Sequence, residues 1–390
     1  MKIQEVQDQL KRAGIEGWLL YDFQGLNPIA RKLLGIAGQM ITRRWYYWIP
    51  RAGDPLAFCH KIEQQAFSPL GVRVDTFRSW QEMVSGLKRH LEGSHTIAME
   101  YSPSCAIPYI SRVDAGTIEL VKSFGKEVVS SANLVQYFEA RWTAEQFQMH
   151  QEAGRRLMII FLDTLAGIRQ ALRAYEVISE YSVQQEMMAM YQECGLKTSS
   201  PPIVAVNQNS ANPHYEPSQE GSAPIQSGDF LLVDFWAKLC EKNSVYADYT
   251  WVAYLGESIP EPVQNIWDIV RGARDAAIDY VRTYYPKTLN LQGWQVDTVS
   301  RDYITQRGYG EFFIHRTGHS IGEEDHGNGA NMDSLETKDE RLLISNTCFS
   351  IEPGIYLKDF GIRSEVNVYL DSEQAVVSGD PIQTEVLKIF

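Results

Sequence analysis

The segment LLVDFWAKLCEKNSVYADYTWVAYL, residues 231–255, contains two apolar runs that each carry an aspartate, Asp234 and Asp248. No basic residue lies within the runs LLVDFW and YADYTWVAYL. An ionised carboxylate in a buried strand is costly unless it is paired with a cation or holds a metal. The segment predicts a β-hairpin in which both carboxylates face the same side of one sheet. Such a hairpin needs a cation.

A second pair of acids repeats this arrangement further along the chain. Glu352 lies in FSIEPGIYL and Glu365 in IRSEVNVYL, 13 residues apart with Gly361 between them. Each acid taken singly also fits a surface or salt-bridged residue. Four carboxylates gathered at one point would repel one another strongly in a medium of low dielectric constant. The two pairs therefore predict a cation-binding cluster built from two strand hairpins.

Three of the eight histidines fall in HRTGHSIGEEDHG, at positions 315, 319 and 326. The spacing of four residues between His315 and His319 suits a helix, but Gly318 and Gly322 favour a loop or a bent strand. Any one of them alone could be an ordinary core histidine. One imidazole with four carboxylates forms an oxygen-rich set that suits Mn²⁺. Four carboxylates balance two divalent ions, and such a pair activates water for hydrolysis.

Composition narrows the classes of protein that fit. The chain has 390 residues, which favours two domains, and 44% of them are hydrophobic. Its formal net charge of −13 argues against nucleic-acid binding. We find no signal peptide and no apolar run approaching a membrane span of about 20 residues. The five cysteines form no CxxC pair, so we expect a reduced cytoplasmic protein without membrane partners.

The pattern of elements changes near residue 140. Before it, helical segments such as residues 79–93 alternate with strand-like runs in residues 17–23, 45–50, 55–60 and 96–101. After it, Thr143 is the expected N-cap of a long amphipathic helix over 144–174. A second helix is expected over 175–194, ending at Gly195. Strands follow at residues 230–255, 312–322, 348–357 and 362–370. The boundary predicts two domains, residues 1–138 and 139–390.

At these residues the sequence resembles the pita-bread metallopeptidases, the family of aminopeptidase P, prolidase and creatinase. The amino-terminal resemblance lies in GIEGWLLYDFQGLNPIARKLLGI and IAMEYSP, and the carboxy-terminal one in GDFLLVDF, DYT, GHSIG, IEPGIY and GIRSE. It implies a fold of class α/β plus α+β. Residues 1–138 would form a small creatinase-like α/β domain. Residues 139–390 would form a pita-bread catalytic domain, with a curved antiparallel sheet and flanking helices.

The resemblance also implies a role for individual residues. Five residues would hold two divalent ions, most suitably Mn²⁺ with Co²⁺ or Zn²⁺ as alternatives: Asp234 on one ion, Asp248 and Glu365 as bridges, and His319 and Glu352 on the other ion. Glu352 would also accept the proton of the attacking water. The remaining residues would serve catalysis or substrate binding: His214 and His326 in contact with substrate and as a source of a general acid or oxyanion contact, His315 supporting the site, and Arg363 near the substrate.

The implied function is hydrolysis of the bond before proline in Xaa-Pro dipeptides or short Xaa-Pro-Yaa peptides, by a homodimer. Two alternatives use the same fold: a non-peptide amidohydrolase like creatinase or ectoine hydrolase, and a binding protein without catalysis. The sequence departs from the family pattern in two ways. The aspartates lie 14 residues apart, with CEKN as an insertion at the hairpin tip. Trp236 and Trp251 occupy positions where smaller or basic residues are usual, and we expect both to reshape the pocket.

Overall fold

The computed structural model describes residues 1–288, 290–378 and 381–390. The chain divides into two compact units, Met1–Glu139 and Ala140–Phe390. Among the described residues, no helix has both the length and the apolar character needed to cross a membrane.

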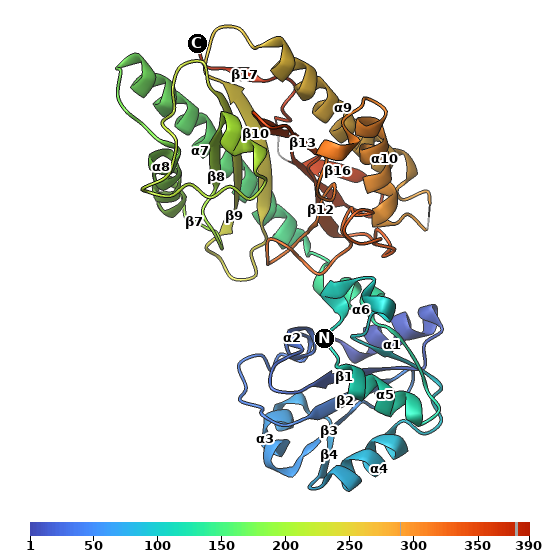
Figure 1. The fold of residues 1–390 in the computed structure, drawn as a ribbon. Helices are drawn as coiled ribbons and strands as arrows, with labels where there is room; N and C mark the ends of the chain where they lie inside the picture. Colours follow the sequence, from blue (N-terminus) through green and yellow to red (C-terminus); the bar gives the residue numbers. More distant parts are fainter. Residues whose placement is uncertain (289, 379–380) are drawn as a thin grey trace. The chain divides into compact units, whose positions relative to one another are not determined.

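A six-stranded sheet with the order β4-β3-β2-β1-β5-β6 forms the centre of the amino-terminal unit (Figure 1). Strand β2 is antiparallel to both of its neighbours, and the other pairs are parallel. Residues alternate between two apolar layers along β1, since Trp18 and Leu20 join one cluster and Leu19 and Tyr21 the other. The strands are β1 (Gly17–Asp22), β2 (Trp45–Pro50), β3 (Leu56–His60), β4 (Arg73–Phe77), β5 (Thr96–Met99) and β6 (Glu127–Ser130). The four predicted strands of this region are confirmed.

Helices cover both faces of this sheet. They are α1 (Ile3–Ala13), α2 (Pro28–Leu33), α3 (Gln64–Phe67), α4 (Trp80–His90), α5 (Ala115–Ser123) and α6 (Ala132–Glu139). Short 3₁₀ turns occupy Lys61–Glu63, Ser68–Leu70, Pro103–Cys105 and Pro108–Ile110. Helix α4 begins where predicted, because the Ser79 hydroxyl caps it by accepting a hydrogen bond of 3.2 Å from the Glu82 amide.

Four long helices belong to the carboxy-terminal unit: α7 (Ala144–Arg173), α8 (Glu180–Glu193), α9 (Glu261–Tyr284) and α10 (Gly293–Thr305). Thr143 caps α7 as predicted, through a reciprocal pair of hydrogen bonds with Gln146. Helix α8 begins five residues later than predicted, because Ser179 is its cap and accepts from the Ser182 amide. Gly195 follows the helix with φ 66°, the left-handed conformation expected of a terminating glycine.

Strands β9 (Phe230–Leu239) and β10 (Ala247–Tyr254) form the predicted hairpin. Asp234 lies opposite Thr250 and Asp248 lies opposite Trp236, so both aspartates point to the same face of the sheet. The other face is apolar and packs on α7, where the rings of Phe161 and Phe235 stack at 5.0 Å between centroids.

Trp251 lies on that apolar face, buried in the core beside Phe161. The expectation that it reshapes the pocket is therefore wrong. A strand turns successive side chains to opposite faces, and Trp251 is three residues from Asp248. Trp236 is an even number of residues from Asp234 and does face the cavity.

The two glutamates lie at a bend between two further strand pairs. Strand β12 (Thr347–Ile351) pairs with β15 (Val366–Leu370), and β13 (Gly354–Tyr356) pairs with β14 (Gly361–Arg363). Glu352 follows β12 and Glu365 precedes β15. Both therefore lie at the junction between the β12–β15 pair and the β13–β14 pair. The predicted strand over 312–322 is mostly irregular, with only Ser320–Ile321 assigned as β11.

The remaining elements complete two layers around the bend. They are β7 (Leu196–Lys197), β8 (Ile203–Val206), β16 (Ala375–Ser378), β17 (Leu387–Lys388) and the 3₁₀ turns Asn207–Ala211 and Gly310–Phe312. Helices α7 and α8 lie against the sheet of β9 and β10, and α9 packs on β12 and β15 (Figure 1). The polar face of β9 and β10 and the polar side of β12 and β15 therefore face each other.

Candidate active site

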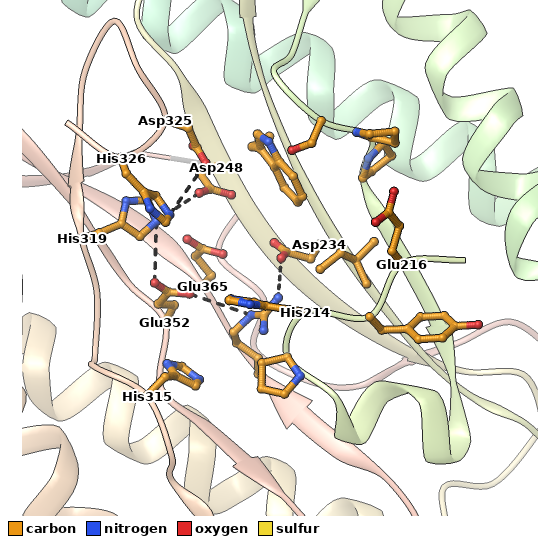
Figure 2. Close-up of a pocket in the computed structure, with 18 of the residues that line it drawn as sticks. His214, Glu216, Asp234, Asp248, His315, His319, Asp325, His326, Glu352 and Glu365 are labelled. Atoms are coloured by element: carbon orange, nitrogen blue, oxygen red, sulfur yellow. Dashed lines mark hydrogen bonds and ion pairs between the residues drawn. The ribbon is translucent and has the colours of Figure 1, made fainter. Parts of the chain in front are cut away.

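One cavity of about 430 Å³ lies between these polar faces in the carboxy-terminal unit. Its wall includes all nine of the predicted site residues, which are His214, Asp234, Asp248, His315, His319, His326, Glu352, Arg363 and Glu365. Figure 2 labels all of them except Arg363. They come from the loop after the 3₁₀ turn Asn207–Ala211, from β9 and β10, from the segments on both sides of β11, from the bend after β12, and from the end of β14 and the residues just after it. The fold therefore brings together residues spread over about 150 positions.

Thr250 is fully buried behind the cavity wall, between the aspartate and glutamate halves of the cluster. Its hydroxyl oxygen lies 2.9 Å from Asp234 Oδ1 and 2.8 Å from Glu365 Oε2, and it accepts a hydrogen bond from Arg363 Nε. The hydroxyl has a single proton and can donate to only one of the two carboxylates. Arg363 also donates to Asp234 Oδ2. One guanidinium and one hydroxyl thus hold Asp234 in place.

The backbone of Asp248 is held from the opposite strand group. Its amide donates to Asn367 Oδ1 at 3.0 Å, and Asn367 Nδ2 donates back to the Asp248 carbonyl at 2.7 Å. Asn367 lies on β15, two residues after Glu365. This reciprocal pair ties the strand of one aspartate to the strand next to one glutamate, so the two halves of the cluster keep a fixed spacing.

His319 presents one ring nitrogen to the acids. Its Nδ1 donates to the Ser320 carbonyl at 3.2 Å, which leaves the lone pair of Nε2 directed at Asp248 Oδ2 and Glu352 Oε1, 3.5 and 3.7 Å away. Burial lowers the pKa of His319, so the ring is neutral at pH 7. A neutral imidazole with a free Nε2 is the form that binds metals.

Two carboxylate oxygens of the cluster have no hydrogen-bond partner among the described residues. They are Asp248 Oδ1 and Glu365 Oε1, and both are buried. Burial raises the pKa of both carboxyls well above the ordinary range, and neighbouring acids raise it further. Burial also raises the pKa of Glu352, although His319 and Arg363 oppose the shift. Such a cluster is stable with its charges only if a cation joins it.

A profile of metallopeptidase family M24 matches residues 149–372, more than half of the chain. The chain belongs to metallopeptidase family M24. An Xaa-Pro dipeptidase of Lactobacillus helveticus is 28% identical over 295 residues, covering 75% of this chain and 72% of that relative. An Xaa-Pro dipeptidase of Lactobacillus delbrueckii subsp. lactis is 32% identical over 217 residues, or 55% of this chain. That match spans about half of the relative, 53%.

Solved structures of similar proteins have the same fold. The dipeptidase PepE of Mycobacterium ulcerans superposes with a TM-score of 0.71 at 23% identity, covering 99% of this chain and 96% of that one. The Xaa-Pro dipeptidase of Bacillus anthracis gives 0.63 at 22% identity, covering 99% and 98%. The carboxy-terminal unit is therefore a pita-bread fold, as the resemblance implied, and the predicted fold class is confirmed.

The residues present fit the divalent ions that membership in family M24 implies. Asp248, His319 and Glu365 offer ligand atoms that all lie within 4.8 Å of one another, and all three are buried. Two of these residues also carry the buried oxygens without partners. Carboxylate oxygens with one imidazole nitrogen form a donor set that suits hard or borderline divalent ions.

His315 and Arg363 are linked through Tyr356. Arg363 Nη1 donates to the Tyr356 hydroxyl at 3.1 Å, and that hydroxyl donates to His315 Nε2 at 2.8 Å. His315 Nδ1 lies 2.7 Å from the Arg316 carbonyl. Burial lowers the pKa of His315 to about 3, so the ring stays neutral. His315 therefore acts in the cavity wall as a fixed hydrogen-bond acceptor for Tyr356, which in turn holds Arg363.

His326 lies at the edge of the cavity, with 62% of its side chain exposed and its ring 4.1 Å from that of His319 between centroids. We expect His326→Ala to keep its divalent ions, because the ring lies outside the group of ligand atoms. Turnover is expected to fall about 10²- to 10³-fold if the imidazole contacts the reacting groups. Metal content by atomic emission and kcat check this, with His95→Ala, an exposed histidine of the other unit, as the control. Complete loss of metal would contradict the placement.

Gly318 brings the His319 segment against β12. A Cβ at this position would lie 1.9 Å from the Ser350 carbonyl oxygen, a backbone atom that cannot move aside. We expect Gly318→Ala to cost at least about 1–3 kcal/mol, as overpacking does. The midpoint of thermal unfolding should fall by roughly 2–10 °C. Gly167→Ala is the matched control, because no atom lies within 4 Å of its added Cβ in α7. An unchanged midpoint in Gly318→Ala would contradict this packing.

Several residues of the site were not predicted from the sequence, and four of them lie close to the predicted ones. Thr250, Asn367, Tyr356 and Asp325 contact the predicted residues by hydrogen bonds or line the same cavity. Thr250 could have been found, because it is two residues after Asp248 and therefore on the same face of a strand. Asn367 stands in the same relation to Glu365. Asp325 carried a signal as well, since it precedes His326 in an acidic run beside the histidines.

Proposed function

We propose that the protein is a dinuclear-metal peptidase that hydrolyses the bond before proline in Xaa-Pro dipeptides or short Xaa-Pro-Yaa peptides. The observation that carries this proposal is the cavity in which four carboxylates and one imidazole converge, in a chain of family M24. Curated relatives carry the name Xaa-Pro dipeptidase. The same carboxy-terminal residues, 139–390, would form the catalytic domain, with residues 1–138 as a creatinase-like domain.

We propose Asp234, Asp248, His319, Glu352 and Glu365 as the residues that hold two divalent ions, with Mn²⁺ as the preferred metal. When bound, the ions would make water nucleophilic at neutral pH and polarise the scissile carbonyl. The protein's own contribution is to fix the donors. Thr250 holds the Glu365 carboxylate and Asn367 holds the backbone of Asp248. His319 offers Nε2 because its Nδ1 is engaged by the Ser320 carbonyl.

Glu352 is the proposed acceptor of the proton from the attacking water. It is buried against His319 and Arg363, and its Oε1 accepts a hydrogen bond of 3.3 Å from the Ser350 hydroxyl. A carboxyl whose pKa is raised by burial holds a proton better than a solvated one, which suits a general base. His214 and His326, both exposed at the cavity, are the proposed donors to the leaving group or the developing oxyanion.

An apolar wall lies beside the acids and would take the proline ring. It contains Pro201, Pro202, Ile203, Pro213 and Trp236. A prolyl bond is a tertiary amide with no N–H, so its recognition depends on ring contacts and on the carbonyl. Flat, rigid side chains suit a five-membered ring because they lose little conformational entropy on contact.

A substrate panel tests the proposed function. Purified protein loaded with Mn²⁺ is expected to cleave Xaa-Pro dipeptides or Xaa-Pro-Yaa tripeptides and to lose activity after chelation. Leu-Leu and other peptides without proline are the controls. About two divalent ions per chain are expected by atomic emission. No cleavage of any prolyl peptide by fully loaded protein would reject the proposal and favour the amidohydrolase alternative, whereas less than one ion per chain would favour the binding protein.

A cytoplasmic location and a homodimeric state complete the proposal. All five cysteines are unpaired, as expected in a reducing compartment. Light scattering of the purified protein checks the oligomeric state, and a mass near that of one chain, 44.4 kDa, would reject the dimer.

A further inference from the structure

The cavity holds more negative charge than two metal ions would neutralise. Seven carboxylates line it, those of Glu216, Asp234, Asp248, Asp325, Glu336, Glu352 and Glu365, against two guanidinium groups, those of Arg316 and Arg363. Two divalent ions would offset four of the five excess charges. One negative charge remains in the loaded cavity, so the preferred ligand carries one positive charge where that carboxylate lies.

Most of the carboxylates already have a partner or water. Arg363 pairs with Asp234 and Glu352, and Arg316 pairs with Glu336 at 3.9 Å. Asp248 and Glu365 belong to the group that can hold a metal. Glu216 is exposed to solvent. Asp325 is therefore the lining carboxylate that has neither an arginine partner nor a proposed metal ion and is not fully exposed to solvent.

The surroundings of Asp325 indicate that a cation completes them. Its Oδ1 is buried, and the side chain within hydrogen-bonding reach of the carboxyl is another acid, Asp248, while 21% of the Asp325 side chain is still exposed. Its Oδ2 lies 3.9 Å from His326 Nε2. The carboxyl stands beside Asp248 (Figure 2). A buried carboxylate next to another carboxylate is unfavourable unless a positive group lies between them or beside them.

We propose that Asp325 binds the α-ammonium group of the peptide substrate. This inference rests on the proposed function. The α-nitrogen of an Xaa-Pro substrate is two bonds from the scissile carbonyl carbon. A substrate whose carbonyl lies at the acid cluster therefore places its ammonium group next to that cluster. Asp325 is adjacent to Asp248 and reaches the cavity, so it is positioned for this contact.

A metal ion is a different occupant for the same carboxylate. Asp234, Asp248, His319, Glu352 and Glu365 already supply the donors proposed for two ions, so Asp325 is not needed among them. An ammonium group needs only a hydrogen-bonding carboxylate, whereas a metal ion needs several donors at short distance. The geometry points to the ammonium group.

Two ligands that differ only in the α-ammonium group test this assignment. Alanyl-proline carries the group and propionyl-proline lacks it. For each Mn²⁺-loaded variant we would measure kcat/KM for alanyl-proline and the inhibition constant of propionyl-proline. Asp325→Asn keeps the shape and removes the charge. Glu324→Gln is the matched control, because it removes an exposed charge from the neighbouring position. Metal content by atomic emission is measured on the same samples.

Asp325→Asn is expected to lower kcat/KM for alanyl-proline about 10- to 100-fold, the usual loss of a hydrogen bond between charged groups. The inhibition constant of propionyl-proline should change less than about threefold, with metal content and Glu324→Gln unchanged. Equal losses for both ligands would overturn the proposal in favour of a general packing effect. Loss of a metal ion would overturn it in favour of a ligand role. If the wild type cleaves no prolyl peptide, the proposed function fails. The dissociation constants of the two dipeptides, measured by titration calorimetry on the Mn²⁺-loaded wild type and Asp325→Asn, still decide whether Asp325 recognises the ammonium group.

Discussion

The Asp248→Ala variant is expected to bind less than one divalent ion per chain and to have no measurable peptidase activity. Asp248 belongs to the one group of described residues that can hold a metal, and its Oδ2 lies 3.5 Å from His319 Nε2. As a proposed bridge it would contact both ions, so its removal weakens both sites. Loss of one ligand typically reduces metal affinity and activity by orders of magnitude, since even supporting residues cost about 10- to 100-fold.

Three measurements check this expectation together. Atomic emission gives the bound metal, and a prolyl dipeptide assay gives the turnover. Thermal unfolding with and without Mn²⁺ gives the stabilisation of the folded state by the metal. The wild type should be stabilised by Mn²⁺, because an ion that binds only the folded state raises its stability, and the variant should not be. Asp268→Ala removes an exposed aspartate of α9 from the same unit and serves as the control. Full activity in Asp248→Ala would refute the assigned bridge.

Metal-free Asp248→Ala is not expected to be less stable than the metal-free wild type. Asp248 Oδ1 is buried without a partner, and burial raises the pKa of this carboxyl well above its value in an unfolded chain. Above the unfolded pKa, such a group destabilises the folded state, and the penalty grows as the pH rises toward the folded pKa. Removing the carboxyl should therefore raise the stability of the chelated protein at pH 7 to 8. A large loss there would mean that Asp248 supports the fold without metal.

The Glu352→Gln variant is expected to lose about 10²- to 10⁴-fold in kcat while retaining bound metal at saturating Mn²⁺. The amide keeps the size of the side chain and an oxygen for a metal, but it cannot accept a proton from water. Glu352 is the proposed acceptor because it stands 3.7 Å from His319 Nε2 and is buried in the cavity wall. The expected result is an unchanged metal content with a strongly reduced turnover.

Comparison with Glu352→Ala sharpens this test. The alanine variant lacks both the oxygen and the base, so it should lose metal as well as turnover. Glu340→Gln changes an exposed glutamate that pairs with Lys338 on the surface, and it should leave both quantities unchanged. A kcat within about threefold of the wild type in fully loaded Glu352→Gln would move the role of base to another residue.

The hairpin could be predicted from sequence because strand periodicity is local. Two apolar runs with an aspartate in each were enough to place Asp234 and Asp248 on one face, and the register of β9 and β10 agrees. The same rule, applied one step further, would have placed Trp251 in the core. The family pattern drew attention to this residue as a departure, although its distance from Asp248 already assigned it to the opposite face.

Other parts depended on contacts that a linear pattern does not reveal. Helices α9 and α10 were not predicted, although the sequence of α9 has a periodic apolar face that packs on β12 and β15. Asn367 joins Asp248 across 119 positions, and its amide has no local pattern. Asp325 reaches the acid cluster only because the loop after β11 folds back over the cavity, which a linear pattern does not show. Of the predicted strand over 312–322 only Ser320–Ile321 forms, because the hydrogen bonds of the preceding residues go to scattered partners, including Met332 and Ser350.

The tip of the β9–β10 hairpin is a place where the chain can change length without changing the chemistry. Cys240, Glu241, Lys242 and Asn243 are all exposed there, while the pairing of Asp234 with Thr250 sets the register nearer the cluster. Lengthening a flexible loop adds little entropy cost to its closure. The four residues are therefore a natural insertion point for a peptide tag or a small reporter domain on the carboxy-terminal unit, because none of them lines the cavity.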